Sequence, residues 1–231
     1  MSIGIIDLSF VPPKLRGKLP SFGEQIRRWL SPSLPEISLE IIDVTGGAEV
    51  PGVADFDGFL ISGSEKGVYD EVIWMDPLRA LLGDIRDHNK PVFGICFGHQ
   101  IMADHFGGKA ELAAVGEARG ARQFDIGSEP REAYVWHKDQ VTKVPPGARV
   151  TASSAYCPVG ALAYDFPAMS TQFHPEYSQE FLRNFVDQGR GEVLDDAESD
   201  AFIAAIAQSN VAEDLMAREA ADFFRRHLLN N

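Results

Sequence analysis

PVFGICFGHQIMADHF, residues 91–106, joins an apolar run to a segment with helical spacing through a Gly-x-Cys-x-Gly turn. Glycine two positions to either side of Cys96 permits a sharp bend, because no Cβ obstructs the neighbouring backbone. The pattern therefore predicts a strand that ends at Cys96 and a helix that begins directly after it. At that helix start the dipole favours a thiolate over a thiol.

Apolar runs similar to residues 91–96 recur along the first half of the chain, at residues 3–7, 39–44 and 57–62. They alternate with amphipathic stretches, which is the pattern of parallel strands connected by helices on both faces of a sheet. After Gly107-Gly108 the segments become shorter and alternate in polarity. We expect an α/β fold with a central, mostly parallel sheet flanked by helices and a smaller antiparallel or mixed sheet.

Helix starts are marked at two places in the first half. Ser21 with Glu24 three residues later forms a capping box, and Asp76-Pro77 reads as an N-cap followed by proline at the first helical position. From residue 191 the chain is rich in alanine at helical spacing, which predicts two C-terminal helices. We expect a catalytic domain at residues 1–190 and a helical extension at 191–231 that packs on it.

The composition excludes several classes of protein. Hydrophobic residues make up 45% and charged residues 24% of 231 residues, a balance typical of globular proteins. A formal charge of -13 disfavours nucleic acid and anionic membrane surfaces as partners. The start, MSIGIIDLSF, has neither a basic segment nor a long apolar one, and no later segment approaches a membrane span, so we expect a cytoplasmic protein.

The two cysteines, Cys96 and Cys157, are too few for a disulfide framework and have no CxxC partner, so no metal site is expected. A cysteine by itself is often a buried packing residue, and we assign that role to Cys157. The flanking glycines make Cys96 a candidate nucleophile instead. The Phe97 N–H would then face the developing oxyanion.

TQFHPE, residues 171–176, supplies the groups that such a nucleophile needs. His174 follows an apolar strand and could act as the base, and Glu176 could orient the imidazole and stabilise its cationic form. The alternative is a surface His-Pro-Glu turn, which the hexapeptide alone does not exclude.

GICFGHQ and QFHPE, in this order and at this separation, resemble the two catalytic signatures of class I glutamine amidotransferases. The resemblance covers residues 4–177 and implies a flavodoxin-like sheet and a Cys96-His174-Glu176 triad. DGFLISGS, residues 57–64, is similar to the strand and turn that give these enzymes a second oxyanion N–H. The resemblance implies Gly63 as that donor beside Phe97, with a plain Gly-Ser turn as the alternative.

The resemblance also implies substrate contacts at Gln100, Ser64 and the segment His137-Lys138-Asp139. Biosynthetic amidotransferases usually carry Ser-His-Gly-Asp and Ser-Gly-Gly-Pro where this chain has His-Lys-Asp and Ser-Gly-Ser-Glu. At both places the sequence of this chain resembles that of the stand-alone branch, which includes γ-glutamyl peptidases and GMP-synthase-like amidotransferase domains. Lys138 would pair with an α-carboxylate or a longer leaving group, or would simply be solvated.

The implied reaction is hydrolysis of the γ-glutamyl amide bond of glutamine, or of a small γ-glutamyl amide or peptide, through a cysteine thioester and without a cofactor. The alternative is a glutaminase subunit that delivers ammonia to a separate synthetase. The roughly 40 residues from 191 onward are too few for a nucleotide-binding domain. A non-catalytic binding module is a third interpretation. The sequence does not determine the identity of the amine leaving group, whether ammonia is passed to a partner, or whether the protein forms a homodimer.

Overall fold

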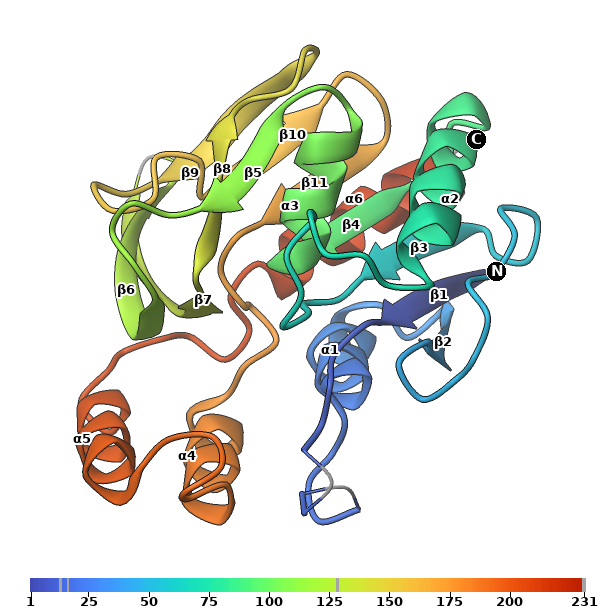
Figure 1. Ribbon diagram of the computed structural model, residues 1–231. Helices are drawn as coiled ribbons and strands as arrows, with labels where there is room; N and C mark the ends of the chain where they lie inside the picture. The colour runs from blue at the N-terminus through green and yellow to red at the C-terminus, as the bar shows by residue number, and fades with distance from the viewer. Residues whose placement is uncertain (13, 16, 128, 230–231) are drawn as a thin grey trace.

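The computed structural model describes residues 1–12, 14–15, 17–127 and 129–229, and a nine-stranded sheet runs through its centre (Figure 1). Five neighbouring strands are parallel in the order β2-β1-β3-β4-β11. They are β2 (Ser38–Asp43), β1 (Ser2–Asp7), β3 (Gly58–Ile61), β4 (Val92–Ile95) and β11 (Ala168–Thr171). This is the flavodoxin-like order, and the predicted α/β fold class is confirmed.

The antiparallel strands mostly extend this same sheet. β11 pairs parallel with β4 on one side and antiparallel with β10 on the other, and so joins the two halves through backbone hydrogen bonds. The extension consists of β10 (Ala161–Tyr164), β9 (Ala148–Ser153), β6 (Ala118–Ile126) and β7 (Glu129–His137). The separate small antiparallel sheet contains β5 (Lys109–Leu112) and β8 (Asp139–Lys143).

Helices cover both faces of the parallel strands. On one face α1 (Phe22–Leu30) and α6 (Ala217–Leu228) pack in one hydrophobic core with β1 and β4, and the 3-10 turn η1 (Ser31–Ser33) follows α1. On the other face α2 (Met75–Asp87) and α3 (Phe97–His105) share a second core with β3. Burial on both faces explains why β1, β3 and β4 are apolar along most of their length, whereas the edge strand β2 is only partly buried and carries polar residues.

The two predicted helix starts differ in outcome. α1 begins as predicted, because the Ser21 hydroxyl accepts the Glu24 N–H at 3.1 Å. α2 begins earlier than predicted, at Met75, with Trp74 rather than Asp76 at the N-cap. Trp74 and Met75 are buried in the core of this face, which fixes the helix start. Pro77 is tolerated as the third helical residue, because the first N–H groups of a helix have no intrahelical acceptor.

The C-terminal part of the chain is divided between two places. α4 (Gln179–Gln188) and α5 (Asp196–Ile206) pack against each other beyond the edge of the sheet, at the lower left of Figure 1. α6 returns to the parallel sheet, where the Trp29 indole donates to the Leu215 carbonyl at 3.0 Å. The predicted boundary at residues 190–191 falls between α4 and α5 and stays a prediction. Within the described ranges, no helix has the length and apolar character needed to cross a membrane.

Candidate active site

The bend at Cys96 is sharp and strained. Cys96 lies directly between β4 and α3 with φ 52° and ψ -100°, a backbone conformation that costs free energy in any residue with a Cβ. The Cys96 N–H donates to the Thr171 carbonyl at 2.7 Å, which holds the bend against β11. A Cβ on Gly98 would lie 2.4 Å from the Ile61 carbonyl oxygen, so this position requires glycine.

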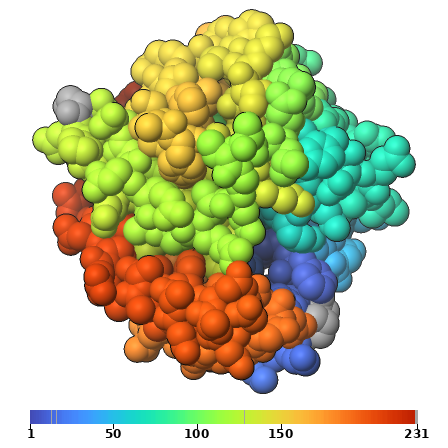
Figure 2. Space-filling view, turned by 60° about the vertical axis from the view of Figure 1, so that its left-hand side comes forward, coloured from blue at the N-terminus to red at the C-terminus, as the bar shows by residue number. Residues whose placement is uncertain are grey.

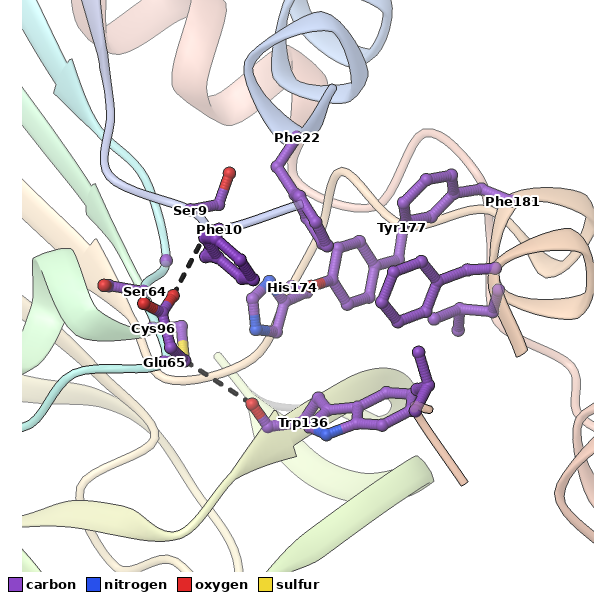
Figure 3. A pocket seen from close by; sticks show the side chains of 14 residues that line it. Ser9, Phe10, Phe22, Ser64, Glu65, Cys96, Trp136, His174, Tyr177 and Phe181 are labelled. Carbon is purple, nitrogen blue, oxygen red and sulfur yellow. Dashed lines mark hydrogen bonds between the residues drawn. The ribbon is translucent and has the colours of Figure 1, made fainter. Parts of the chain in front are cut away.

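The carboxyl ends of three adjacent parallel strands bring the predicted groups together. Gly63 follows β3, Cys96 follows β4 and His174 follows β11, all at the same edge of the sheet. A Cβ placed on Gly63 would lie 3.0 Å from Cε1 of His174 and 3.5 Å from Cβ of Cys96. Figure 3 shows the His174 ring between Cys96 and Tyr177.

His174 and Glu176 form a buried ion pair. His174 Nδ1 lies 2.7 Å from Glu176 Oε1, and both side chains are almost fully buried. Burial by itself lowers the pKa of His174, but the charges of Glu176 and Cys96 and hydrogen bonding outweigh it, so the pKa is raised. Among the described residues, His174 Nε2 has no hydrogen-bond partner of normal geometry. That nitrogen is therefore the candidate position for the proton transfer predicted for His174.

The ring of Tyr177 lies flat against the imidazole. The two ring centroids are 4.1 Å apart and the planes differ by 6°. Together with the Glu176 contact this stacking fixes the orientation of His174, because the ring can neither tilt nor flip without losing one of them. Burial, followed by the charges of Glu176, Cys96 and Asp7, raises the pKa of Tyr177 well above its ordinary value, so the phenol stays neutral.

The sulfur of Cys96 has two further polar neighbours. The side-chain N–H of Gln172 donates to Sγ at 3.7 Å, and the Trp136 carbonyl oxygen lies 3.8 Å from Sγ. Gln172 in turn accepts from Gln100 Nε2 at 3.2 Å, and Gln100 Nε2 also donates to the Asp139 carbonyl at 2.9 Å. Gln100 thus orients a donor to the sulfur. Sequence reasoning assigned no role to Gln172, although it lies inside the QFHPE motif.

The turn after β3 is held by one hydroxyl. Ser62 Oγ accepts the Leu8 N–H at 2.8 Å and donates to the Gly63 carbonyl at 2.8 Å. In a trans peptide the N–H points opposite to the carbonyl, so the Ser64 N–H is directed away from Ser62. Across the site, Phe97 is the first residue of α3, where backbone N–H groups have no intrahelical acceptor. These N–H groups are the candidates for binding an oxyanion.

A polar pocket adjoins Cys96. It brings together all the predicted substrate contacts, which are Ser64, Gln100, His137, Lys138 and Asp139. Sequence reasoning missed the other charged groups in its lining, Glu65, Lys66 and Glu117. The positions of Glu65 and Lys66 in the pocket could have been suspected, because they directly follow the Gly63-Ser64 turn. Glu117 lies outside every motif that the sequence offers.

The pocket residues differ in exposure and bonding. His137 Nδ1 contacts the Asp139 carbonyl at 3.0 Å, and burial, then the positive charge of His174, lowers its pKa to about 4. His137 is therefore neutral at physiological pH. The buried Asp139 carboxylate accepts from the Tyr69 hydroxyl at 3.1 Å, and Lys138 is exposed.

A second pocket opens on the other side of Cys96 and is lined mainly by aromatic rings from α1, β7 and α4. Sequence reasoning did not predict it, because Phe181, Leu182 and Phe185 have the spacing of an ordinary core-facing helix.

His99, on the buried side of α3, makes structural hydrogen bonds: its two ring nitrogens contact Ser170 Oγ at 2.8 Å and the Val159 carbonyl at 3.1 Å. Outside the few residues that the structure leaves undescribed, no group of three or more His, Cys, Asp or Glu side chains is placed to hold a metal ion.

Comparisons with known proteins place this arrangement in a family. The family described as "Glutamine amidotransferase class-I" matches residues 19–186. The γ-glutamyl peptidase 5 of Arabidopsis thaliana is 31% identical over 73% of this chain and 69% of its own length. A glutamine-hydrolysing GMP synthase subunit of Thermoplasma acidophilum is 31% identical over 66% of this chain and 82% of its own length.

Longer relatives and solved structures agree with this. The chain spans 26% of the GMP synthase of Listeria innocua, with 39% identity over 55% of this chain. A glutamine amidotransferase structure from Thermotoga maritima covers 98% of this chain and is itself covered to 97%, with a TM-score of 0.76 and 17% identity, and so supports the fold. The resemblance inferred from the motifs is confirmed: the chain belongs to the class I glutamine amidotransferase family.

Proposed function

We propose that this protein hydrolyses the γ-glutamyl amide bond of glutamine or of a γ-glutamyl amide or peptide. The observation that carries the proposal is the juxtaposition of a strained Cys96 at a helix N-terminus with the His174-Glu176 pair, whose ring nitrogen and carboxylate oxygen lie 2.7 Å apart. A nucleophile, a base and a group that orients the base are the parts that acyl transfer requires. Membership of the family and the γ-glutamyl peptidase relative support the same reaction.

The first half of the reaction forms a thioester. The Cys96 thiolate attacks the γ-carbonyl carbon, and the carbonyl electrons move to oxygen, where backbone N–H groups stabilise the negative charge. Phe97 supplies one of them, and Gly63 or its neighbour Ser64 supplies the other. When the tetrahedral intermediate collapses, the C–N bond breaks and His174 Nε2 gives its proton to the departing amine.

The second half regenerates the enzyme. His174, now neutral, accepts a proton from a water molecule that attacks the thioester carbon. Collapse of this second intermediate breaks the C–S bond and leaves glutamate, a Cys96 thiolate and a His174 imidazolium. Glu176 stabilises that imidazolium at the start and the end of each cycle, which accords with the raised pKa of His174.

The polar pocket fits the rest of the glutamyl group. A glutamyl substrate carries an α-ammonium and an α-carboxylate, and the pocket offers both signs of charge. The carboxylates of Glu65, Glu117 and Asp139 and the ammonium groups of Lys66 and Lys138 all line it. Because Lys138 is exposed, it can move to meet the α-carboxylate without losing a buried contact.

A second candidate function is a glutaminase subunit that passes ammonia to a separate synthetase. Its support is the similarity to the Thermoplasma GMP synthase subunit, together with the small share of the longer GMP synthases that this chain spans. The departures from Ser-Gly-Gly-Pro and Ser-His-Gly-Asp favour the stand-alone hydrolase. A non-catalytic module is disfavoured because cysteine, histidine and glutamate are all present and adjacent.

The test is a substrate panel with one readout. Purified protein is given glutamine, γ-glutamylglycine and γ-glutamylethylamide, and released glutamate is measured; an acid quench with intact-mass analysis reports a covalent acyl group on Cys96. We expect glutamate release in the absence of any partner. Release only after a synthetase is added would favour the second candidate, and no release under either condition would overturn both.

A further inference from the structure

Two pockets meet at Cys96 and differ in character. Both are lined by Cys96, Ser64, Glu65 and Trp136, so the sulfur lies at their junction. The polar pocket described above is one of them. The other, which we call the aromatic pocket, is lined by the rings of Phe22, Trp136, Tyr177, Phe181 and Phe185. Figure 2 shows a hollow where the orange C-terminal helices, the blue N-terminal segment and the green strands meet.

The position of His174 tells which pocket holds which half of the substrate. His174 lines the aromatic pocket and not the polar one. The histidine of a cysteine acyl-transfer site protonates the departing amine, so the amine must leave on the side where the imidazole lies. The acyl half then occupies the polar pocket, and the body of the amine occupies the aromatic pocket.

The aromatic rings form a continuous wall rather than scattered contacts. Phe22 meets Tyr177, Phe181 and Phe185 with ring centroids 6.0, 5.5 and 5.6 Å apart. Phe185 meets Trp136 at 5.8 Å, and Tyr177 stacks on the catalytic imidazole itself. The wall therefore begins at the proton donor and leads outward from it, as Figure 3 shows. Another ring can add to such a wall by edge or stacked contacts.

The charge of this pocket excludes one class of amine. Among the described residues, its lining contains no lysine and no arginine, while it does contain the Glu65 carboxylate. Among the described lining residues, the His174 imidazolium is the one group that can be cationic, and it is already paired with Glu176. An amino acid or peptide as leaving group would therefore bring its own carboxylate into this place without a cation that is free to pair with it, and burying an unpaired carboxylate is costly. Ammonia, the leaving group of glutamine, would leave the apolar wall unused.

Resting on the proposed function, we propose that the aromatic pocket is the leaving-group site and that it selects arylalkyl primary amines without a carboxylate. The preferred substrates are then γ-glutamyl arylalkylamides. Cleavage consumes one water and gives glutamate and the free amine, with the Cys96 thioester between the two steps. The C–N bond that breaks lies at the junction of the pockets, beside His174 Nε2.

The test compares kcat/KM for γ-glutamylbenzylamide, γ-glutamylglycine and glutamine, with released glutamate as the common readout. We expect the benzylamide to exceed each of the other two by about tenfold or more, because a filled apolar pocket discriminates on this scale. Phe185→Leu on α4 and Phe22→Leu on α1 should each lower the ratio of benzylamide to γ-glutamylglycine. Both rings are only half-buried, and circular dichroism checks that each variant is folded.

Phe166→Leu is the matched control. Phe166 is also half-buried, but it precedes β11 and so lies at the opposite edge of the sheet from the site. In this variant the ratio of kcat/KM for the benzylamide to kcat/KM for γ-glutamylglycine should match the wild type. Equal kcat/KM for all three substrates, or a preference for γ-glutamylglycine, overturns this inference and leaves the proposed function standing. A benzylamide preference that survives both aromatic substitutions overturns the assignment to this pocket. No glutamate from any substrate overturns the proposed function itself.

Discussion

Cys96 and Cys157 are both buried thiols, yet the groups that surround them differ. Cys96 is bent to φ 52° at the start of α3, faces the His174-Glu176 pair and lies where two pockets meet. Cys157 is fully buried, and its thiol donates to the Val159 carbonyl at 3.7 Å. Burial, aided by the nearby charge of Cys96, raises the pKa of Cys157 to about 12. The Cys157 thiol therefore stays protonated, whereas Cys96 has beside it the His174-Glu176 pair that the proposed nucleophile needs.

The largest expected effect of a substitution is on kcat, and it should differ sharply between the two thiols. Cys96→Ala should lower kcat by about 10⁴-fold or more for every γ-glutamyl substrate, because the variant lacks the sulfur that forms the thioester. Cys157→Ala should leave kcat within about twofold, since the Cys157 thiol bonds the Val159 carbonyl rather than the triad. Glutamate release measures both. Retained turnover in Cys96→Ala would refute the contrast between the thiols and the proposed function with it.

A smaller loss of activity is expected when the carboxylate that pairs with His174 is neutralised. Glu176→Gln should lower kcat/KM by roughly 10²- to 10⁴-fold, because a neutral amide orients the imidazole without stabilising its charge. The charge of Glu176 raises the pKa of His174, so its removal lets the imidazolium lose its proton at lower pH. The alkaline limb of the pH profile should therefore move to lower pH.

The pH profile separates this effect from a packing defect. Glu180→Gln, on the first turn of α4, is a matched control that removes an exposed carboxylate and should keep the wild-type profile. An unshifted alkaline limb in Glu176→Gln would mean that Glu176 positions the ring without tuning it.

The weakest of these effects is on folding stability, where Cys96 tests backbone strain and Cys157 tests packing. Cys96→Gly should have a free energy of unfolding about 1 kcal/mol higher than Cys96→Ala, because both variants lack the buried thiol and glycine adopts φ 52° without strain. Cys157→Ala should lower it by roughly 1–2 kcal/mol, because it leaves a small cavity in the core. Urea denaturation followed by circular dichroism measures both. A stability of Cys96→Gly equal to or below that of Cys96→Ala would show that the bend is not strained.

Several features of the fold could be predicted because they depend on residues close together in the sequence. The apolar runs of β1, β3 and β4 and the Gly94–Gly98 elbow are local patterns, and each lies where it was expected. The helix start at Asp76-Pro77 was predicted wrongly, because burial of Trp74 and Met75 overrode the local capping signal. The predicted smaller antiparallel sheet is present as β5 and β8. That most of the other antiparallel strands extend the large sheet, through the pairing of β11 with both β4 and β10, depends on long-range contacts that no local pattern encodes.

The chemistry that we propose for the site is already indicated by the residues alone. Cysteine between two glycines, and histidine two residues before glutamate, indicate a nucleophile and its base, because those local bends and spacings admit few other uses. The surroundings of these groups depend on tertiary structure. The rings of the aromatic pocket come from α1, β7, α4 and the segment between β11 and α4, and the groups of the polar pocket come from equally distant segments. Which amine fits depends on how these segments pack in space, and packing is a property of the whole fold rather than of any stretch of it.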